Sequence, residues 1–361
     1  MSESHFSKTY TEARRRFIDA ATAAGATLKS YRIDTQSQED LTIDVAIIGP
    51  DTAPTVVTSS GVHGVEGFFG SATQHALLDN LRQAKSQNHI RHVLIHGVNP
   101  FGFSHFRRAN EDNIDLNRNF IPKGNKYEGA PDGYKRLNHI LNPTSPPSRL
   151  ESFKLRALWM ICRHGLQPLK QAIAGGQYKY PRGIFFGGHG PSKSHQVICE
   201  NCEDWMGSSN KIVHIDFHTG LGAFGTYKLL LTEFEKPEAF PWYTNAFGSD
   251  CVEPPDIPDP TAYRVSGMFG GLLQQHFADR EYRFLLAEFG TYGVIRVLKA
   301  IRAENRAYHY GVENSTTYQS AKKEFLECFC PNDVLWRRQV VASGLKVIAQ
   351  ATHAISGHKD K

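Results

Sequence analysis

The chain has 361 residues, of which 40% are hydrophobic and 21% charged, and its formal net charge at pH 7 is +5. This balance is typical of a globular protein with a large core, so it excludes collagen, coiled coil and disorder as descriptions of the whole chain. The positive charges form only short clusters, which argues against a nucleic-acid partner.

Short segments with continuous rather than alternating hydrophobicity predict buried strands. The expected strands are 43–48, 55–58, 92–98, 184–186, 212–217, 229–232 and 283–289. Apolar residues at helical spacing predict helices over 70–85, 153–174, 270–278, 294–308 and 334–355. Alternating strands and helices predict an α/β fold in which helices flank both faces of a mostly parallel or mixed sheet.

We expect a single domain over residues 1–361. The loop-rich segment 121–181 is too short for a core of its own, so we interpret it as a lid or insertion. No run approaches the ~18–20 apolar residues of a spanning helix, and the N-terminus is polar, so we expect a cytoplasmic protein without a membrane partner. The six cysteines are irregularly spaced, which fits reduced thiols better than a structural zinc site.

Four segments could carry chemistry, and the first is Ser60-Gly-Val-His63-Gly-Val-Glu66-Gly67, directly after an expected strand. His63 and Glu66 are three residues apart, so on a first helical turn they share one face and could bind a divalent metal. Taken alone, this spacing is common, and a helix-capping or surface role for Glu66 is the simpler interpretation.

The second segment is a buried strand that ends in polar and glycine residues, Ile-Val-His214-Ile-Asp216-Phe-His218-Thr-Gly. Because side chains alternate along a strand, the two histidines and the aspartate point to one face, with His218 nearest the carboxyl end. His218 could complete a His₂Glu metal set, or it could be a core histidine paired with a carboxylate.

The third segment runs from Asn99-Pro-Phe-Gly-Phe through two adjacent arginines to Asp115-Leu-Asn117-Arg118-Asn119. Arginine and amide donors could recognise an anion here, although a solvated loop would have the same composition. The fourth segment is an apolar strand that contains Glu288. A carboxylate in such a strand is either paired or serves as a base, since a low dielectric raises its pKa.

Together these segments resemble the M14-type zinc carboxypeptidase superfamily, and most closely the bacterial M14-like group DUF2817. The motifs follow in the family's order: H-x-x-E, N-P-x-G-[FY], R-x-N with D-x-N-R-N, a strand ending in His and a strand ending in Glu. The nucleophile-elbow, P-loop and dinucleotide motifs of other enzyme classes are absent.

The resemblance implies one zinc ion held by His63, Glu66 and His218. It implies that Asp115 orients the first ligand histidine and that Glu288 is the general base and acid.

The resemblance also implies roles around the substrate. Arg108, or its neighbour Arg107 if the register is shifted by one, would polarise the scissile carbonyl. Asn117 and Arg118 would hold a terminal carboxylate, and Tyr263 would be the family's mobile tyrosine.

The function expected from this resemblance is a metallocarboxypeptidase-like hydrolase that cleaves an amide bond near a free carboxylate. Its substrate would be a peptide or an acyl-amino acid, and the oligomeric state is left open. One alternative is an N-acyl amino acid deacylase of the aspartoacylase and succinylglutamate desuccinylase type. The other is a non-catalytic zinc-binding module of the same fold. Helical spacing over 294–361, in place of the deacylases' extra β-domain, favours the peptidase branch.

Overall fold

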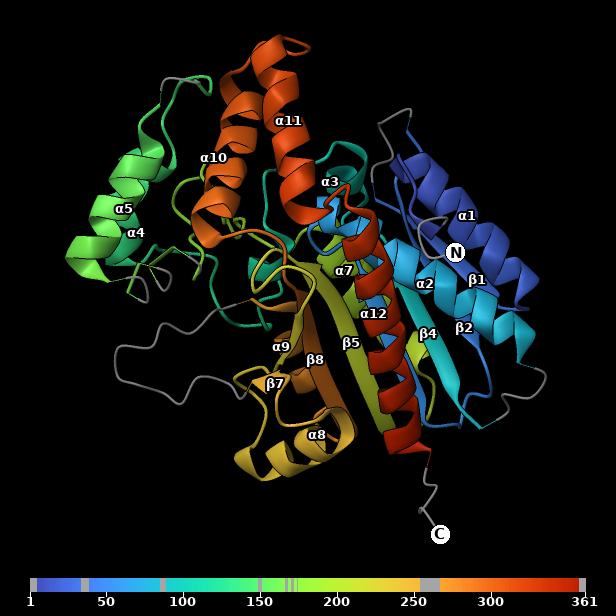
Figure 1. The fold of residues 1–361 in the computed structure, drawn as a ribbon. Coiled ribbons are helices and arrows are strands. Elements are labelled where there is room, and N and C mark those ends of the chain that lie inside the picture. Colours follow the sequence, from blue (N-terminus) through green and yellow to red (C-terminus); the bar gives the residue numbers. More distant parts are fainter. Residues whose placement is uncertain are drawn as a thin grey trace.

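The computed structural model describes residues 5–33, 39–84, 89–148, 151–165, 168–169, 172–173, 175–253 and 267–356. An eight-stranded sheet crosses the molecule in the order β1-β2-β4-β3-β5-β8-β6-β7 (Figure 1). The strands are β1 (Thr27–Arg32), β2 (Thr42–Ile48), β3 (Thr55–Ser60), β4 (Arg91–His96), β5 (Lys211–Thr219), β6 (Tyr227–Leu230), β7 (Val252–Glu253) and β8 (Glu281–Phe289).

The sheet is mixed, as predicted. Strands β4, β3, β5 and β8 are mutually parallel, whereas β1, β2 and β6 pair with their neighbours in the antiparallel direction. The carboxyl ends of the four parallel strands therefore meet at one edge of the sheet, where ligand sites of α/β proteins form.

Helices cover both faces of this sheet. They are α1 (Tyr10–Ala23), α2 (Gly67–Gln83), α3 (Pro100–Ser104), α4 (Asp132–Leu141), α5 (Phe153–His164), α7 (Lys193–Met206), α8 (Phe240–Phe247), α9 (Phe269–His276), α10 (Val294–Tyr310), α11 (Thr316–Phe329) and α12 (Val334–Ile355). Helices α1, α2 and α12 pack side by side on one face, and α7 and α9 pack on the other. None of the described helices is long and apolar enough to cross a membrane.

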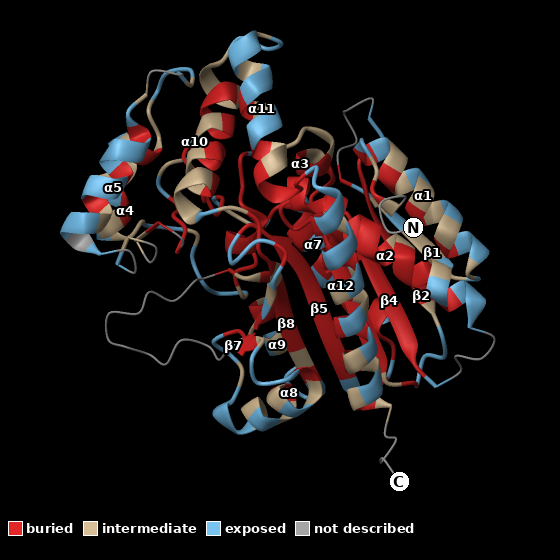
Figure 2. Ribbon diagram, in the orientation of Figure 1, coloured by how far each residue is buried: buried red, intermediate tan, exposed pale blue. Residues whose placement is uncertain are grey.

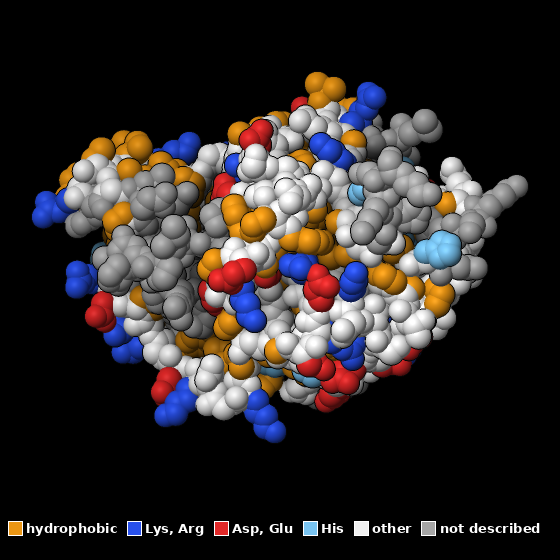
Figure 3. All heavy atoms as spheres, turned by 90° about the horizontal axis from the view of Figure 1, so that it is seen from below, with side chains coloured by type: hydrophobic (Ala, Val, Ile, Leu, Met, Phe, Trp, Pro, Cys, Tyr) orange, Lys and Arg blue, Asp and Glu red, His pale blue; other side chains and the backbone are white. Residues whose placement is uncertain are grey.

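Burial explains why the central strands have continuous apolar sequences. All residues of β3 and β4 are buried, and the same holds for β5 after its first residue (Figure 2). The edge strand β1 is partly exposed along its length, so it lacks the continuous apolar run that predicts a buried strand. On the face seen in Figure 3, basic and acidic side chains are interspersed.

Two predicted elements were wrong. The segment 184–186 forms only an isolated bridge between Gln177 and Phe186, because the positive φ of 55° at Phe185 interrupts the extended backbone. The helix predicted over 153–174 ends at His164. Gly165 follows it with a φ of 79°, a conformation that stops a helix.

Helices α4 and α5 lie within the segment 121–181, which we had interpreted as a lid or insertion. Glu151 joins this segment to α10 through ion pairs of 2.8 Å with Arg302 and 2.5 Å with Arg306. The segment thus packs beside α10, as Figure 1 shows.

Candidate metal centre

A tight turn between β3 and α2 carries His63 and Glu66. His63 keeps an extended backbone, and the short 3₁₀ helix Gly64–Glu66 leads directly into α2. A Cβ atom at Gly64 would lie 1.9 Å from the backbone carbon of Gly102. Only glycine therefore permits the close approach of the α3 segment, which lies beside this turn.

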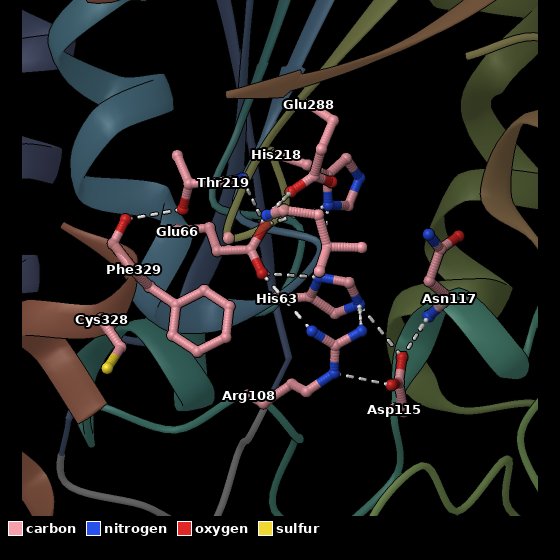
Figure 4. Close-up of polar contacts among 12 residues, drawn as sticks. His63, Glu66, Arg108, Asp115, Asn117, His218, Thr219, Glu288, Cys328 and Phe329 are labelled. Atoms are coloured by element: carbon pink, nitrogen blue, oxygen red, sulfur yellow. Dashed lines mark hydrogen bonds and ion pairs between the residues drawn. The ribbon is translucent and has the colours of Figure 1, made fainter. Parts of the chain in front are cut away.

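Three side chains meet at the carboxyl ends of β3 and β5 (Figure 4). Glu66 Oε1 lies 2.9 Å from His63 Nδ1, and Glu66 Oε2 lies 3.0 Å from His218 Nδ1. One ligand atom from each of the three side chains lies within 4.8 Å of the others. All three residues are buried, so this group matches the sequence prediction for the metal ligands in position.

The charges within this group favour a cation. Burial by itself would raise the pKa of Glu66, but His63 and His218 lower it below its usual range. Burial opposes protonation of His218, yet Asp216 and Glu66 raise its pKa well above the ordinary imidazole value. A buried carboxylate between two imidazoles needs positive charge, and two nitrogens with one oxygen form a donor set that suits zinc.

Glu288 lies at the end of β8, directly opposite His218 in the register of the parallel pair. Its Oε1 accepts a hydrogen bond of 2.8 Å from the backbone N–H of Leu221. Burial, together with the negative charge of Glu66, raises the pKa of Glu288 to about 7. This carboxylate can therefore take up and release a proton near neutral pH.

Arg108 and Asp115 contact His63 on the side away from Glu66. The guanidinium Nε of Arg108 donates to Asp115 Oδ2 at 2.8 Å, and its Nη2 lies 2.7 Å from His63 Nε2. Asp115 Oδ1 lies 3.2 Å from the same imidazole nitrogen. Burial alone would raise the pKa of Asp115, but Arg108 and His63 hold it well below its usual range. Asp115 thus lies where the prediction placed a residue that orients His63.

Arg107 points away from this group. Its Nε donates to Glu304 at 3.0 Å and its Nη2 donates to Asn113 at 2.8 Å, and the guanidinium stacks 3.4 Å from the ring centroid of Tyr308. Of the two adjacent arginines, the structure brings Arg108 to the metal-ligand group and uses Arg107 to join this loop to α10.

Asn117 and Arg118 lie on a short 3₁₀ helix next to Asp115. Asn117 Oδ1 accepts from the backbone N–H of Phe269 at 2.9 Å, and Arg118 Nη1 donates to the carbonyl of Asn117 at 2.6 Å. Both residues are buried. The predicted Tyr263 falls outside the described residues.

Sequence reasoning missed the residue that bonds to the outer nitrogen of His218. Asp216 Oδ2 lies 2.6 Å from His218 Nε2. The alternation of side chains along β5 already placed Asp216 and His218 on one face, and that alternation was the available signal.

One other group of potential ligands occurs among the described residues, formed by His5, His75 and Asp79. Arg16 contributes positive charge beside it, and burial together with this charge lowers the pKa of His75 to about 4. The neighbouring guanidinium opposes a bound dication, so this group does not match the His63–Glu66–His218 group as a metal site.

The sheet order and the buried histidine and glutamate ligands together define an α/β protein of carboxypeptidase-like fold with a candidate metal centre. A family model described as "Protein of unknown function (DUF2817)" matches residues 6–343, so the chain belongs to this family. The family resemblance inferred from the motifs is therefore confirmed.

Solved structures agree with this fold. Carboxypeptidase A from Helicoverpa armigera is similar with a TM-score of 0.50 at 14% identity, over 98% of this chain and 75% of that one. Bovine thrombin-activatable fibrinolysis inhibitor, in complex with tick carboxypeptidase inhibitor, has a TM-score of 0.45 at 10% identity, over 95% and 98% of the two chains. A succinylglutamate desuccinylase from Silicibacter has a TM-score of 0.39 at 14% identity, over 79% and 65%. A search of curated proteins finds no match.

Proposed function

We propose that this protein is a zinc-dependent hydrolase of the carboxypeptidase type, which cleaves an amide bond near a free carboxylate. The observation that carries the proposal is the buried group of His63, Glu66 and His218, with the carboxylate of Glu288 opposite His218 on the next strand. The motif resemblance supports the same assignment. We also propose that residues 1–361 act as one domain and that the segment 121–181 is an insertion beside the site.

His63, Glu66 and His218 would hold the zinc ion, which would polarise a carbonyl oxygen and make water more acidic. Glu288 accepts a proton from the attacking water and later returns it to the leaving nitrogen. Its pKa of about 7 suits both steps, because the same carboxylate must be a base first and an acid afterwards.

Arg108 stabilises negative charge that develops on the carbonyl oxygen of the substrate. Its guanidinium lies beside His63 and is held by Asp115, so its donors are already oriented before substrate binds. Asn117 and Arg118 bind the terminal carboxylate of the substrate, which fixes the scissile bond relative to Glu288.

The test is to compare the wild type with Glu288→Gln and His63→Ala for zinc content and for hydrolysis of dipeptides and N-acyl amino acids. We expect Glu288→Gln to keep its zinc and to lose about 10²–10⁴-fold in kcat, since it cannot take up a proton. We expect His63→Ala to lose both zinc and activity. Near-normal hydrolysis by Glu288→Gln would contradict the role of this base.

The substrate panel separates the alternatives. Preferential hydrolysis of N-acyl amino acids would assign the protein to the deacylase branch. Zinc binding without hydrolysis of any substrate in the panel would identify a non-catalytic module. The presence of Glu288 and Arg108 beside the ligands supports the catalytic assignment.

A further inference from the structure

A continuous chain of hydrogen bonds runs from His218 into the core between the sheet and α9. His218 Nε2 lies 2.6 Å from Asp216 Oδ2, and Asp216 Oδ1 accepts from Ser59 Oγ at 2.6 Å. Ser59 Oγ lies 2.7 Å from His214 Nε2. His214 Nδ1 lies 2.6 Å from the hydroxyl of Tyr282. All five residues are buried.

The chemistry of the groups allows only one direction for the protons in this chain. The Asp216 carboxylate can only accept, so the single proton of Ser59 goes to Asp216 and His218 Nε2 donates to it. Ser59 Oγ must then accept from His214 Nε2. A neutral His214 has its other nitrogen unprotonated, so it accepts the hydroxyl proton of Tyr282.

The surroundings of His214 support this assignment. Burial lowers its pKa to about 4, so the ring is neutral at pH 7. The rings of Phe269 and Phe284 contact it edge-on, with centroids 5.3 and 5.0 Å away. Both nitrogens of His214 have hydrogen-bonding partners within the chain.

The consequence falls on His218. Because its Nε2 carries the proton given to Asp216, its Nδ1 presents a lone pair on the side of Glu66 and His63. The local contacts of His63 leave its tautomer open, since its Nε2 lies within reach of the Asp115 carboxylate and also of an Arg108 donor.

We infer that Ser59, His214 and Tyr282 are positioning residues, which hold Asp216 so that His218 binds a metal ion through Nδ1. This inference rests on the proposed metal centre. Groups that hydrogen-bond to a ligating histidine orient its ring and increase its basicity, and their loss typically weakens metal affinity about 10–100-fold. Here that function extends through two further side chains into the core.

The experiment measures the zinc dissociation constant by chelator competition for the wild type, Ser59→Ala and Tyr282→Phe. We expect Ser59→Ala to weaken zinc affinity about tenfold. Tyr282→Phe removes one hydroxyl and keeps the ring, so we expect a loss of about two- to tenfold. In the cobalt-loaded protein both variants should shift the visible absorption bands, because these bands report ligand geometry.

Two matched controls lie on the other face of the sheet. Ser71→Ala breaks a buried serine–histidine contact, of 2.9 Å to His96 Nε2. Tyr10→Phe removes a buried tyrosine hydroxyl, which donates to the carbonyl of Thr42 at 3.1 Å. Both controls should keep the wild-type zinc affinity and cobalt spectrum, even where they lower the unfolding temperature.

Two results would overturn the inference, and they are distinguishable. If the wild type binds zinc and both Ser59→Ala and Tyr282→Phe bind it equally tightly with unchanged cobalt spectra, the inference is wrong and the proposed function stands. If the wild type itself binds no zinc, the proposed function is wrong and the inference falls with it. Should Ser59→Ala fail to fold, Tyr282→Phe alone decides between these results.

Discussion

His218 Nδ1 lies 3.2 Å from His63 Nδ1, although 155 positions separate the two residues in the sequence. The parallel pairing of β3 with β5 produces this proximity, because it aligns Ser60 with Phe217 at the carboxyl ends of both strands. Each histidine then needs only a short extension beyond its pairing position to reach Glu66.

The first prediction concerns pH and Glu288. A base must be deprotonated to act, so activity should rise as the pH increases through the pKa of this carboxyl group. That pKa is about 7 in the metal-free protein, and a bound dication lowers it. We therefore expect the acid limb of kcat/KM to have its midpoint at or below about pH 7.

The check is a pH profile of the wild type and of Glu288→Asp, in which the shorter side chain keeps a carboxyl group. A residual activity in Glu288→Gln with an unchanged acid limb would show that another group titrates there.

The second prediction uses the adjacent arginines as a matched pair. Arg108→Met should lower kcat about 10²–10³-fold while zinc content stays near one ion per chain, because it removes charge stabilisation at the substrate carbonyl. Arg107→Met should leave the chemistry intact. It should instead lower the free energy of unfolding by about 3 kcal/mol, since it leaves Glu304 buried with one fewer partner.

Steady-state kinetics and urea unfolding of both variants provide the measurement. The reverse pattern, with Arg107→Met losing turnover and Arg108→Met only stability, would contradict the assignment of Arg108.

The third prediction concerns recognition of the terminal carboxylate. Arg118→Gln should lower kcat/KM for substrates with a free carboxylate about 10–100-fold, since it removes a charged hydrogen bond to the substrate. The same substrates with an amidated terminus have no carboxylate to bind, so their kcat/KM should change little. An equal loss on both substrate sets would argue that Arg118 supports the fold rather than the substrate.

The fourth prediction concerns acid stability. Burial lowers the pKa of His92 from 6.5 to about 4, so the unfolded chain binds a proton in this interval that the folded protein does not. The stability that neutral His92 contributes is therefore complete above pH 6.5 and is lost as the pH falls towards 4. For one histidine with this shift, the loss is about 3 kcal/mol.

His92→Leu should remove this loss, so the difference in free energy of unfolding between variant and wild type should grow as the pH falls from 7 to 4. Urea unfolding at several pH values measures it. The exposed His353 on α12 provides the control, because His353→Gln should follow the wild-type pH dependence throughout.

The sequence was sufficient for the features that depend on local spacing. Continuous apolar runs predicted the buried central strands, and polar residues after them predicted which ends carry the site. The motifs around His63, Glu66 and Glu288 also identified the family. These signals are readable because strand burial and helix periodicity act over a few neighbouring residues.

Only the tertiary structure decided how distant segments meet. Strand register brought His218 beside Glu66, and packing against α10 turned Arg107 inward while Arg108 faced the ligands. The chain from Asp216 to Tyr282 likewise depends on three different strands. Such contacts depend on which strands become neighbours, and that choice is made by burial of the whole core rather than by residues adjacent in sequence.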